Sequence, residues 1–113
     1  MHEYSIVQSL LESCENHAKQ NDASKVMKVV VKIGVLSGVE PDLLKSAFDT
    51  FKEETICADC EFVINSQPVV ITCNDCNETT TLETMEFKCQ KCGSLQVSTI
   101  DGEDMYLMSL ELE

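Results

Sequence analysis

The sequence predicts an α+β protein in which a small three-stranded sheet with two helices is interrupted by an inserted cysteine-rich module. Two amphipathic segments with helical spacing predict the helices, and short stretches of alternating apolar residues predict the strands. Two Cys-x-x-Cys pairs precede the last of these strands and mark the insertion. A chain of 113 residues has room for one domain with a small module inside it.

The first helix is predicted to begin at Ser5 and to end near Gln20. Ser5 with Gln8 three residues later forms a capping-box pattern, which typically opens a helix. Apolar residues then recur at steps of three and four, so one face of the helix should be buried. The residues of this face are Ile6, Val7, Leu10, Leu11, Cys14 and Ala18.

A half-buried strand is predicted over residues 27–33, with Met27, Val29, Val31 and Ile33 facing the core. A second helix should begin at Pro41, which suits the first helical position. Its apolar stripe is predicted to comprise Leu43, Leu44, Ala47, Phe48 and Phe51.

Two more strands complete the predicted sheet. Phe62 and Ile64 mark a short strand, and residues 105–112 alternate again. The face of this last strand is predicted to carry Tyr106, Met108, Leu110 and Leu112. Because the last strand must return to the earlier elements to bury that face, we expect one domain from residues 1–67 and 102–113, with 68–101 inserted.

The composition restricts the classes of partner. The formal net charge is −12, from 20 acidic and 8 basic residues, and all the basic residues are lysines. Nucleic-acid phosphates and anionic membrane surfaces repel such a chain, so neither is an expected partner. The opening residues lack the basic and apolar regions of a secretory signal, so we expect a cytoplasmic, reducing location. There, seven cysteines indicate metal ligands or redox thiols before disulfides.

Four late cysteines predict a structural zinc site. A tight Cys-x-x-Cys turn places two thiolates on one ion, and two such turns complete a closed tetrahedral site. Spacing alone does not decide which pairs cooperate, because a third pair, Cys57 and Cys60, begins sixteen residues before Cys73. We favour the two late pairs, because the segment around them has no other support. They are Cys73 with Cys76, and Cys89 with Cys92.

The other three cysteines allow simpler interpretations. Cys57 and Cys60 are interpreted as partly buried thiols without a chemical role, and a redox disulfide between them is the alternative. Cys14 lies on the apolar face of the first helix and is assigned to the core.

The N-terminus offers a second metal-binding arrangement. A free α-amine has a pKa near ~8 and loses its proton readily to a metal. The amine, the amide nitrogen of His2 and its imidazole would form adjoining chelate rings, which suit Ni(II) or Cu(II). His17, the other histidine, is interpreted as a residue at the edge of the first helix.

Four segments occur in an order that resembles the HypA family, the nickel metallochaperones of [NiFe]-hydrogenase maturation. They are Met1 to Ser5, Val29 to Gly34, Ser46 to Phe51, and the two late cysteine pairs. The resemblance extends over the whole chain. It differs at Cys57, which gives a Cys-x-x-Cys where a single cysteine is expected.

The resemblance implies a nickel-binding domain with an inserted zinc-ribbon-like domain. Nickel would bind at Met1, His2 and Glu3, with Glu40 near the metal. Structural zinc would occupy the site of the two late pairs. The implied partners are the GTPase HypB and the hydrogenase large subunit, and in some bacteria the urease maturation proteins.

Two alternatives remain open at this point. A zinc-ribbon module could bind proteins without transferring nickel, and a thiol oxidoreductase could use Cys57 and Cys60, which would require one reactive thiol of low pKa. No other enzyme is indicated, because no nucleophile–base pair, phosphate loop or open metal site is recognisable in the sequence.

Overall fold

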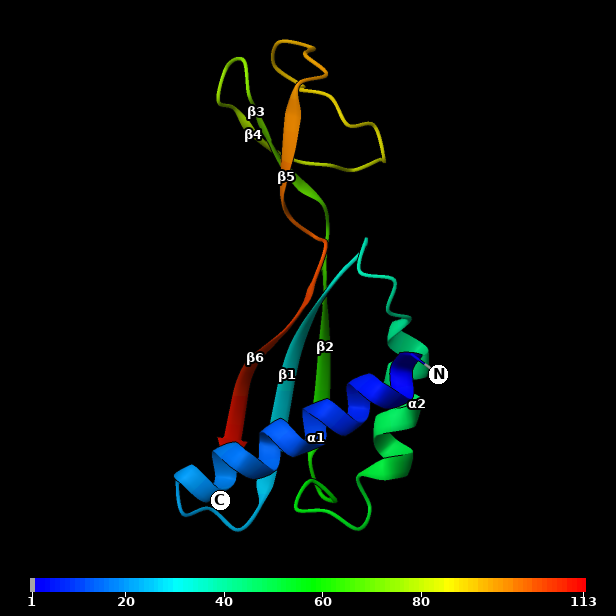
Figure 1. Cartoon of the computed structure of the whole chain (residues 1–113), viewed down its shortest axis with the longest axis vertical. Helices are drawn as coiled ribbons and strands as arrows, with labels where there is room; N and C mark the ends of the chain where they lie inside the picture. The colour runs from blue at the N-terminus through cyan, green and yellow to red at the C-terminus, as the bar shows by residue number, and fades with distance from the viewer. Residues whose placement is uncertain (1) are drawn as a thin grey trace.

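The structure, a computed structural model, describes the backbone of residues 2–113 and the side chains of residues 3–113. The molecule is elongated, with extents of 52 × 28 × 17 Å, and carries one small sheet toward each end (Figure 1). In the part of the chain that is described, no helix is both long enough and apolar enough to cross a membrane.

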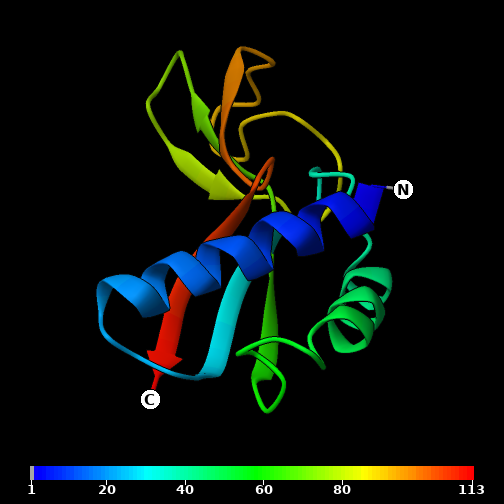
Figure 2. The same ribbon diagram turned by 60° about the horizontal axis from the view of Figure 1, so that its bottom comes forward.

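The larger sheet contains three strands in the order β2-β1-β6. Its central strand β1 (Val26–Gly34) pairs in parallel with β2 (Glu61–Gln67) and antiparallel with β6 (Met105–Leu112). Helices α1 (His2–Gln20) and α2 (Pro41–Phe51) lie together on one face of this sheet (Figures 1 and 2). The predicted α+β class, with its three-stranded sheet and two helices, is confirmed.

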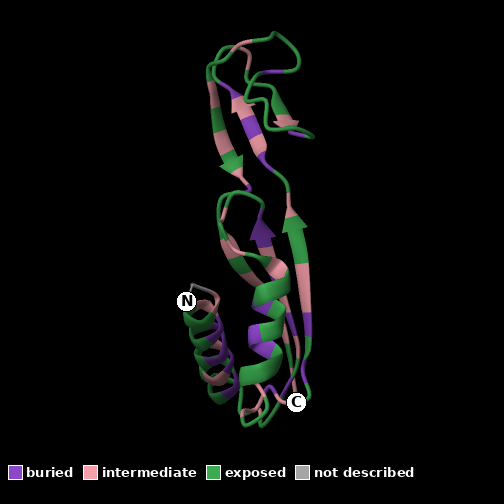
Figure 3. Cartoon of the chain, turned by 90° about the vertical axis from the view of Figure 1, so that its right-hand side faces the viewer, coloured by how far each residue is buried: buried purple, intermediate pink, exposed green. Residues whose placement is uncertain are grey.

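The main core lies between the two helices and this sheet. Val7 and Cys14 of α1, Val29 of β1 and Phe48 of α2 are all fully buried in one cluster. Phe48 stacks on Phe62 of β2 with ring centroids 4.1 Å apart, which joins the second helix to the sheet. Figure 3 shows buried residues in both helices and in the strands of this sheet.

The first helix begins earlier than the capping-box pattern predicted. It begins at His2, so Ser5 lies inside the helix and does not cap it. Its end at Gln20 is as predicted. Packing explains the longer helix, because Tyr4 in the first turn meets Phe51 of α2 edge to face at 5.1 Å.

Irregular pairing changes the predicted faces of two strands. The register between β1 and β6 shifts between Val26 and Lys28, so Val26 is buried and Met27 is exposed. A second shift lies beside Met108, where β6 has one more residue than its partner strand. Met105 and Leu107 therefore pack on the core, and the predicted core residues Tyr106 and Met108 are exposed.

The apolar stripe of the second helix is narrower than predicted. Leu44, Ala47 and Phe48 are buried as expected. Leu43 and Phe51 are exposed at the sides of the helix.

The smaller sheet has the order β4-β3-β5, and all its pairs are antiparallel. Its strands are β3 (Val70–Cys73), β4 (Thr79–Thr81) and β5 (Val97–Asp101), all inside the segment 68–101. The buried apolar residues beneath it are Val69, Ile71 and Leu82, with Val97 partly buried against them. We refer to this segment as the cysteine module and to the rest of the chain as the helical domain.

The chain crosses twice between the two parts, and the crossings are packed tightly. A Cβ atom added to Gly34 would lie 2.3 Å from backbone atoms of Gly102, so no side chain fits there. The loop after β1 is bonded to both crossings, because Val35 N–H donates to Gln67 O at 3.0 Å and Leu36 N–H donates to Gly102 O at 2.8 Å. The junction therefore joins three segments of backbone.

Candidate metal centres

Four sulfur atoms converge at the outer end of the cysteine module. The ligand atoms of Cys73, Cys76, Cys89 and Cys92 all lie within 4.8 Å of one another. Cys73 Sγ is 3.6 Å from Cys92 Sγ, and Cys76 Sγ is 3.6 Å from Cys89 Sγ. Four sulfurs at Zn–S distances of about 2.3 Å in a tetrahedron would lie about 3.8 Å apart, so the site fits one zinc ion.

Each of the two Cys-x-x-Cys pairs forms a tight backbone turn, and both turns have the same N–H to sulfur contact. The N–H of Cys76 points to Cys73 Sγ at 3.4 Å, and the N–H of Cys92 points to Cys89 Sγ at 3.4 Å. Each turn closes at a residue with positive φ, and Gly93 in the second turn adopts this conformation without strain. The two-residue spacing thus aims both sulfurs of a pair at one point.

Polar side chains connect the two halves beside the sulfurs. Ser94 donates a hydrogen bond to Asp75, and Ser98 donates one to Asn74 Oδ1 at 3.1 Å. The N–H of Asn74 also donates to Gln96 O at 2.8 Å. These bonds tie the first turn to the segment after the second turn, so the geometry does not depend on a metal ion alone.

The crowded thiols differ in acidity. Hydrogen bonds from the backbone N–H groups of Cys92 and Lys91 lower the pKa of Cys89 to about 6. A backbone hydrogen bond at Glu78 favours the Cys76 thiolate, but burial and the neighbouring thiols outweigh it and raise the pKa of Cys76 to about 12. A divalent cation would remove this difference, because it binds all four sulfurs as thiolates.

The structure decides which pairs share a site. Cys57 and Cys60 lie in the core of the helical domain, where both are buried. They were expected to be only partly buried. Burial, as the largest cause, raises the pKa of Cys60 to about 11. Within the described residues, the four late cysteines form the only group of three or more His, Cys, Asp or Glu that could hold one ion.

Cys57 has a thiol neighbour that its spacing did not indicate. A hydrogen bond with Cys14 of α1 is the main cause that lowers the pKa of Cys57. The same hydrogen bond, followed by burial, raises the pKa of Cys14. Cys14 is fully buried, as predicted. In the sequence, both residues adjoin apolar segments, but this pattern alone does not predict that the two thiols lie together.

The predicted nickel residues lie only partly within the described structure. Met1 and the side chain of His2 fall outside it. Glu3 is half-buried and lines a small hollow of about 140 Å³ against α2, together with Leu43 and Ser46. In Figure 1 the start of α1 lies beside α2.

Glu40 lies at the N-terminal end of α2 and its side chain is exposed. Its backbone carbonyl accepts the first helical hydrogen bond, from Leu44 N–H at 2.9 Å, but its carboxylate does not cap the helix. The hollow at Glu3 is lined by Leu43, one turn after Glu40. Among the described residues, no hydrogen bond or ion pair engages the carboxylate of Glu40.

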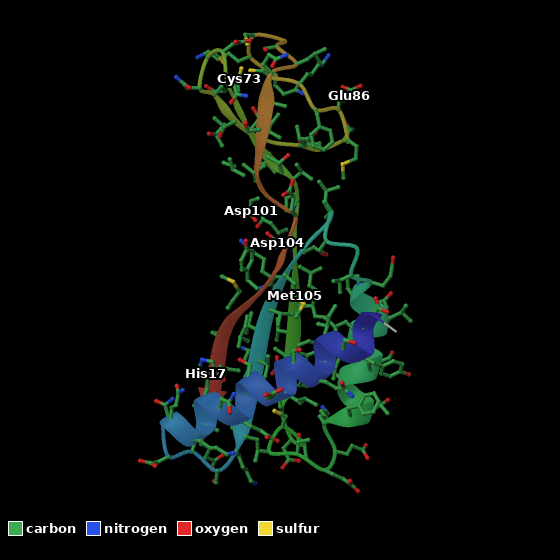
Figure 4. The ribbon with its side chains drawn as sticks, in the orientation of Figure 1. His17, Cys73, Glu86, Asp101, Asp104 and Met105 are labelled. Atoms are coloured by element: carbon green, nitrogen blue, oxygen red, sulfur yellow. The ribbon has the colours of Figure 1, made fainter. Side chains whose placement is uncertain are left out.

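His17 lies at the other end of α1, as Figure 4 shows, and its ring nitrogen Nδ1 is bonded to Ser13 O at 2.8 Å. This local contact within the helix agrees with its interpretation as an edge residue.

Comparison with known proteins identifies the family. A family model described as "Hydrogenase/urease nickel incorporation, metallochaperone, hypA" matches residues 1–112. The chain belongs to the HypA family. The fold and the four-cysteine cluster described above are thus those of a HypA protein.

Relatives in the HypA family match over nearly their full length. The hydrogenase maturation factor HypA of Shewanella halifaxensis is 54% identical over 113 residues, which cover 100% of this chain and 98% of that protein. The HypA of Aquifex aeolicus is 51% identical with the same coverage. The solution structure of the nickel metallochaperone HypA from Helicobacter pylori is 41% identical, has a TM-score of 0.71, and covers 97% of this chain and 96% of that one.

Proposed function

We propose that this chain binds Ni(II) at its N-terminus and delivers it, with the GTPase HypB, to the large subunit of [NiFe]-hydrogenase in the cytoplasm. Membership of a family described by nickel incorporation is the observation that carries this proposal. The description of the family names both hydrogenase and urease, so urease maturation is proposed as a second use of the same cargo. Nickel is the transferred ion here, and zinc is the resident one.

The first turn of α1 supports nickel ligation by the backbone. The first four N–H groups of a helix have no intrahelical acceptor, so the amide nitrogens of His2 and Glu3 bind a metal without breaking a helical bond. Together with the α-amine of Met1 and the imidazole of His2 they form a nitrogen-rich set, which Ni(II) prefers.

Two carboxylates balance the charge at this site. The N-terminus of a helix carries a partial positive charge, which disfavours a bound cation. Glu3 lies in the first turn of α1, and Glu40 opens α2. We propose that both carboxylates lie beside the nickel and offset this repulsion, with Glu40 as the ligand or hydrogen-bond acceptor closest to the metal.

The four-cysteine site is proposed to hold structural zinc. Four thiolates around one ion leave no open position, so this site serves folding and not delivery. The N-terminal site differs, because its ligands belong to a chain end that a partner can pull away. The two metals therefore have separate tasks in one small protein.

The decisive experiment is a Ni(II) titration of the untagged, zinc-loaded chain, followed by visible absorption. His2→Ala should abolish high-affinity binding, and a chain extended by residues before Met1 should lose it as well, because the α-amine becomes an amide. His17→Ala is the matched control at the far end of the same helix and should bind nickel like the parent.

The proposal is wrong if His2→Ala and the extended chain both retain nickel with unchanged affinity. Such a result would move nickel to the cysteines and leave a zinc-containing interaction module without nickel transfer.

A further inference from the structure

The two edge strands of the larger sheet differ in whether side chains hydrogen-bond to their backbone. At the β2 edge, two lysines of the α2 region point their ammonium groups at backbone carbonyls: Lys45 Nζ to Phe62 O at 3.5 Å and Lys52 Nζ to Cys60 O at 3.1 Å. For β6, the described residues include no side chain that hydrogen-bonds the backbone of Met105–Leu112. Its outer N–H and C=O groups are therefore available to another strand.

The sequence of β6 also lacks the usual protection of an edge. Met105–Leu112 contains no proline and no lysine, and its only charge is Glu111. Tyr106 and Met108 are 47% and 54% exposed on the sheet face opposite the helices. A long, apolar, unprotected edge promotes uncontrolled association unless a partner strand covers it.

A groove runs along the inner side of this edge, between β6 and α1. Its first part is a hollow of about 440 Å³ bounded by Met105 and Leu107 of β6 and by Ser5, Ser9 and Ser13 of α1. The serines recur every four residues, so they line the same side of the helix and keep it free of bulky side chains.

The groove continues past Leu107 into a second hollow of about 380 Å³. This part is bounded by His17 and Asn21 of α1 and by residues 107–110 and 112 of β6. Figure 4 shows Met105 and His17 toward the two ends of this feature. A groove thus accompanies the open edge, mainly apolar beside Met105 and Leu107 and mixed polar and apolar beside His17 and Asn21.

The shape of this surface favours an extended segment as its ligand. An added strand would satisfy the free backbone groups of β6, and every second side chain would enter the groove. A helix would fill the groove but leave the edge unpaired. The occupant is therefore a β-strand.

The negative charge at both ends of β6 favours a strand from a different protein over β6 of a second copy of this chain. Glu103 and Asp104 precede β6, and Glu111 and Glu113 lie at its end, all exposed. Antiparallel pairing of two β6 strands would place these acidic ends against each other, and parallel pairing would do the same. Like charges in opposed positions destabilise a strand pair.

We propose that the β6 edge and its groove bind an extended segment of a partner protein, with alternating apolar residues and with lysine or arginine at its ends. The groove begins at Ser5, near the start of α1. The binding surface itself does not depend on nickel.

The test uses a synthetic strand as the probe. A peptide of about ten residues, alternating valine and threonine between paired lysines, matches the length of β6. It is titrated into the ¹⁵N-labelled, zinc-loaded, nickel-free chain. We expect chemical-shift changes on β6 and on the serine side of α1, and slower amide exchange at β6. The same peptide with glutamates at its ends should bind at least about tenfold more weakly, because the acidic ends repel it.

Two matched substitutions on α1 locate the surface. Ser9→Phe fills the groove, whereas Gln8→Phe adds the same bulk at an exposed neighbouring position that does not line it. Ser9→Phe should lower the affinity for the lysine-ended peptide about tenfold or more, and Gln8→Phe should leave this affinity unchanged.

Several results would overturn the proposal. They are no binding of the lysine-ended peptide, equal binding of the glutamate-ended one, or shifts confined to β2 or the cysteine module. A dimer in sedimentation that Ser9→Phe dissociates would assign the edge to a second copy instead. Because nickel is absent throughout, none of these results bears on the proposed nickel site.

Discussion

The helical domain and the cysteine module are stabilised in different ways. The core of the helical domain joins both helices to all three strands, with Val7, Val29, Leu44 and Phe48 fully buried. The cysteine module has its own sheet but only three buried apolar residues outside its cysteines. The apolar core of the module is much smaller than that of the helical domain, so we expect the module to depend on cross-linking by a metal.

This difference also explains why cysteine has two roles in one chain. In the helical domain, Cys14 and Cys57 fill space as small apolar side chains within a packed core. In the module, the sulfurs face one another and few apolar atoms surround them. The same residue type thus fills the core in one region and forms a candidate metal site in the other.

Removing the metal should have the largest effect, and it should act on one region only. Structural zinc in small modules contributes on the order of 10–16 kcal/mol to folding. With a strong zinc chelator, amides of β3, β4 and β5 should lose their protection from hydrogen exchange, while those of β1 and β2 keep theirs. Loss of protection in both sheets together would show that the regions fold as one unit.

Thiol reactivity should separate the two kinds of cysteine by orders of magnitude in rate. After chelation, an alkylating reagent should modify the four module cysteines quickly and leave Cys14, Cys57 and Cys60 intact, as measured by mass spectrometry. The pKa of Cys57 is lowered, but its side chain is fully buried, so access limits the reaction. Rapid labelling of Cys57 in the native protein would instead favour the thiol oxidoreductase alternative.

Gly34→Ala tests the junction between the two regions. The new methyl group would lie 2.3 Å from the backbone of Gly102, so the crossings must move apart. We expect a loss of about 3 kcal/mol in urea denaturation, typical of a backbone clash. Gly38→Ala is the control, because nothing lies within 4 Å of its Cβ and only its positive φ opposes the change, at about 1 kcal/mol. Equal losses would show that the junction is loose.

The smallest effect is expected from Asp101→Asn, at the ion pair that spans the junction. Lys32 Nζ is 3.0 Å from Asp101 Oδ2, and this hydrogen bond lowers the pKa of the carboxyl below its usual range. A lowered carboxyl pKa stabilises the fold above the unfolded value of about 4, and this contribution is lost as the pH falls below it. The substitution should therefore reduce stability at pH 7, and the difference should vanish in acid.

Asp59→Asn is the matched control for this ion pair. Asp59 is 3.8 Å from Lys25, and both side chains are exposed, so its removal should change little at any pH. Acid also releases metal from thiolates in every variant, and for that reason only differences between variants are compared. A constant Asp101→Asn effect down to pH 2 would contradict the role of the charge.

Sequence reasoning was sufficient for the order of elements in the helical domain and for the four-cysteine cluster, but it did not predict the strands β3, β4 and β5. Both depend on local patterns: helical spacing in α1 and α2, and the turn that each Cys-x-x-Cys pair makes. It failed where long-range pairing decides the outcome. The bulge beside Met108 reverses which side of β6 is buried before that residue, whereas Leu110 and Leu112 pack on the core as predicted. The sequence of the strand contains no signal for this bulge.

Two other details could be recognised only in the folded structure. Helix α1 begins before its capping-box pattern because Tyr4 packs on Phe51, a contact between residues far apart in sequence. Cys14 and Cys57 meet for the same reason. The assignment of Glu3 and Glu40 to the nickel site came from the family resemblance and is part of the proposed function.

The chain leaves the helical domain and returns to it at the same end of the sheet. Gln67 pairs with Gly34 in the last position of β2, and Met105 pairs with Ile33 in the first position of β6. The cysteine module is therefore a removable insertion: residues 68–101 could be deleted and the ends joined by a short turn. Because both connections are held at this junction, they restrict rotation of the module relative to the helical domain.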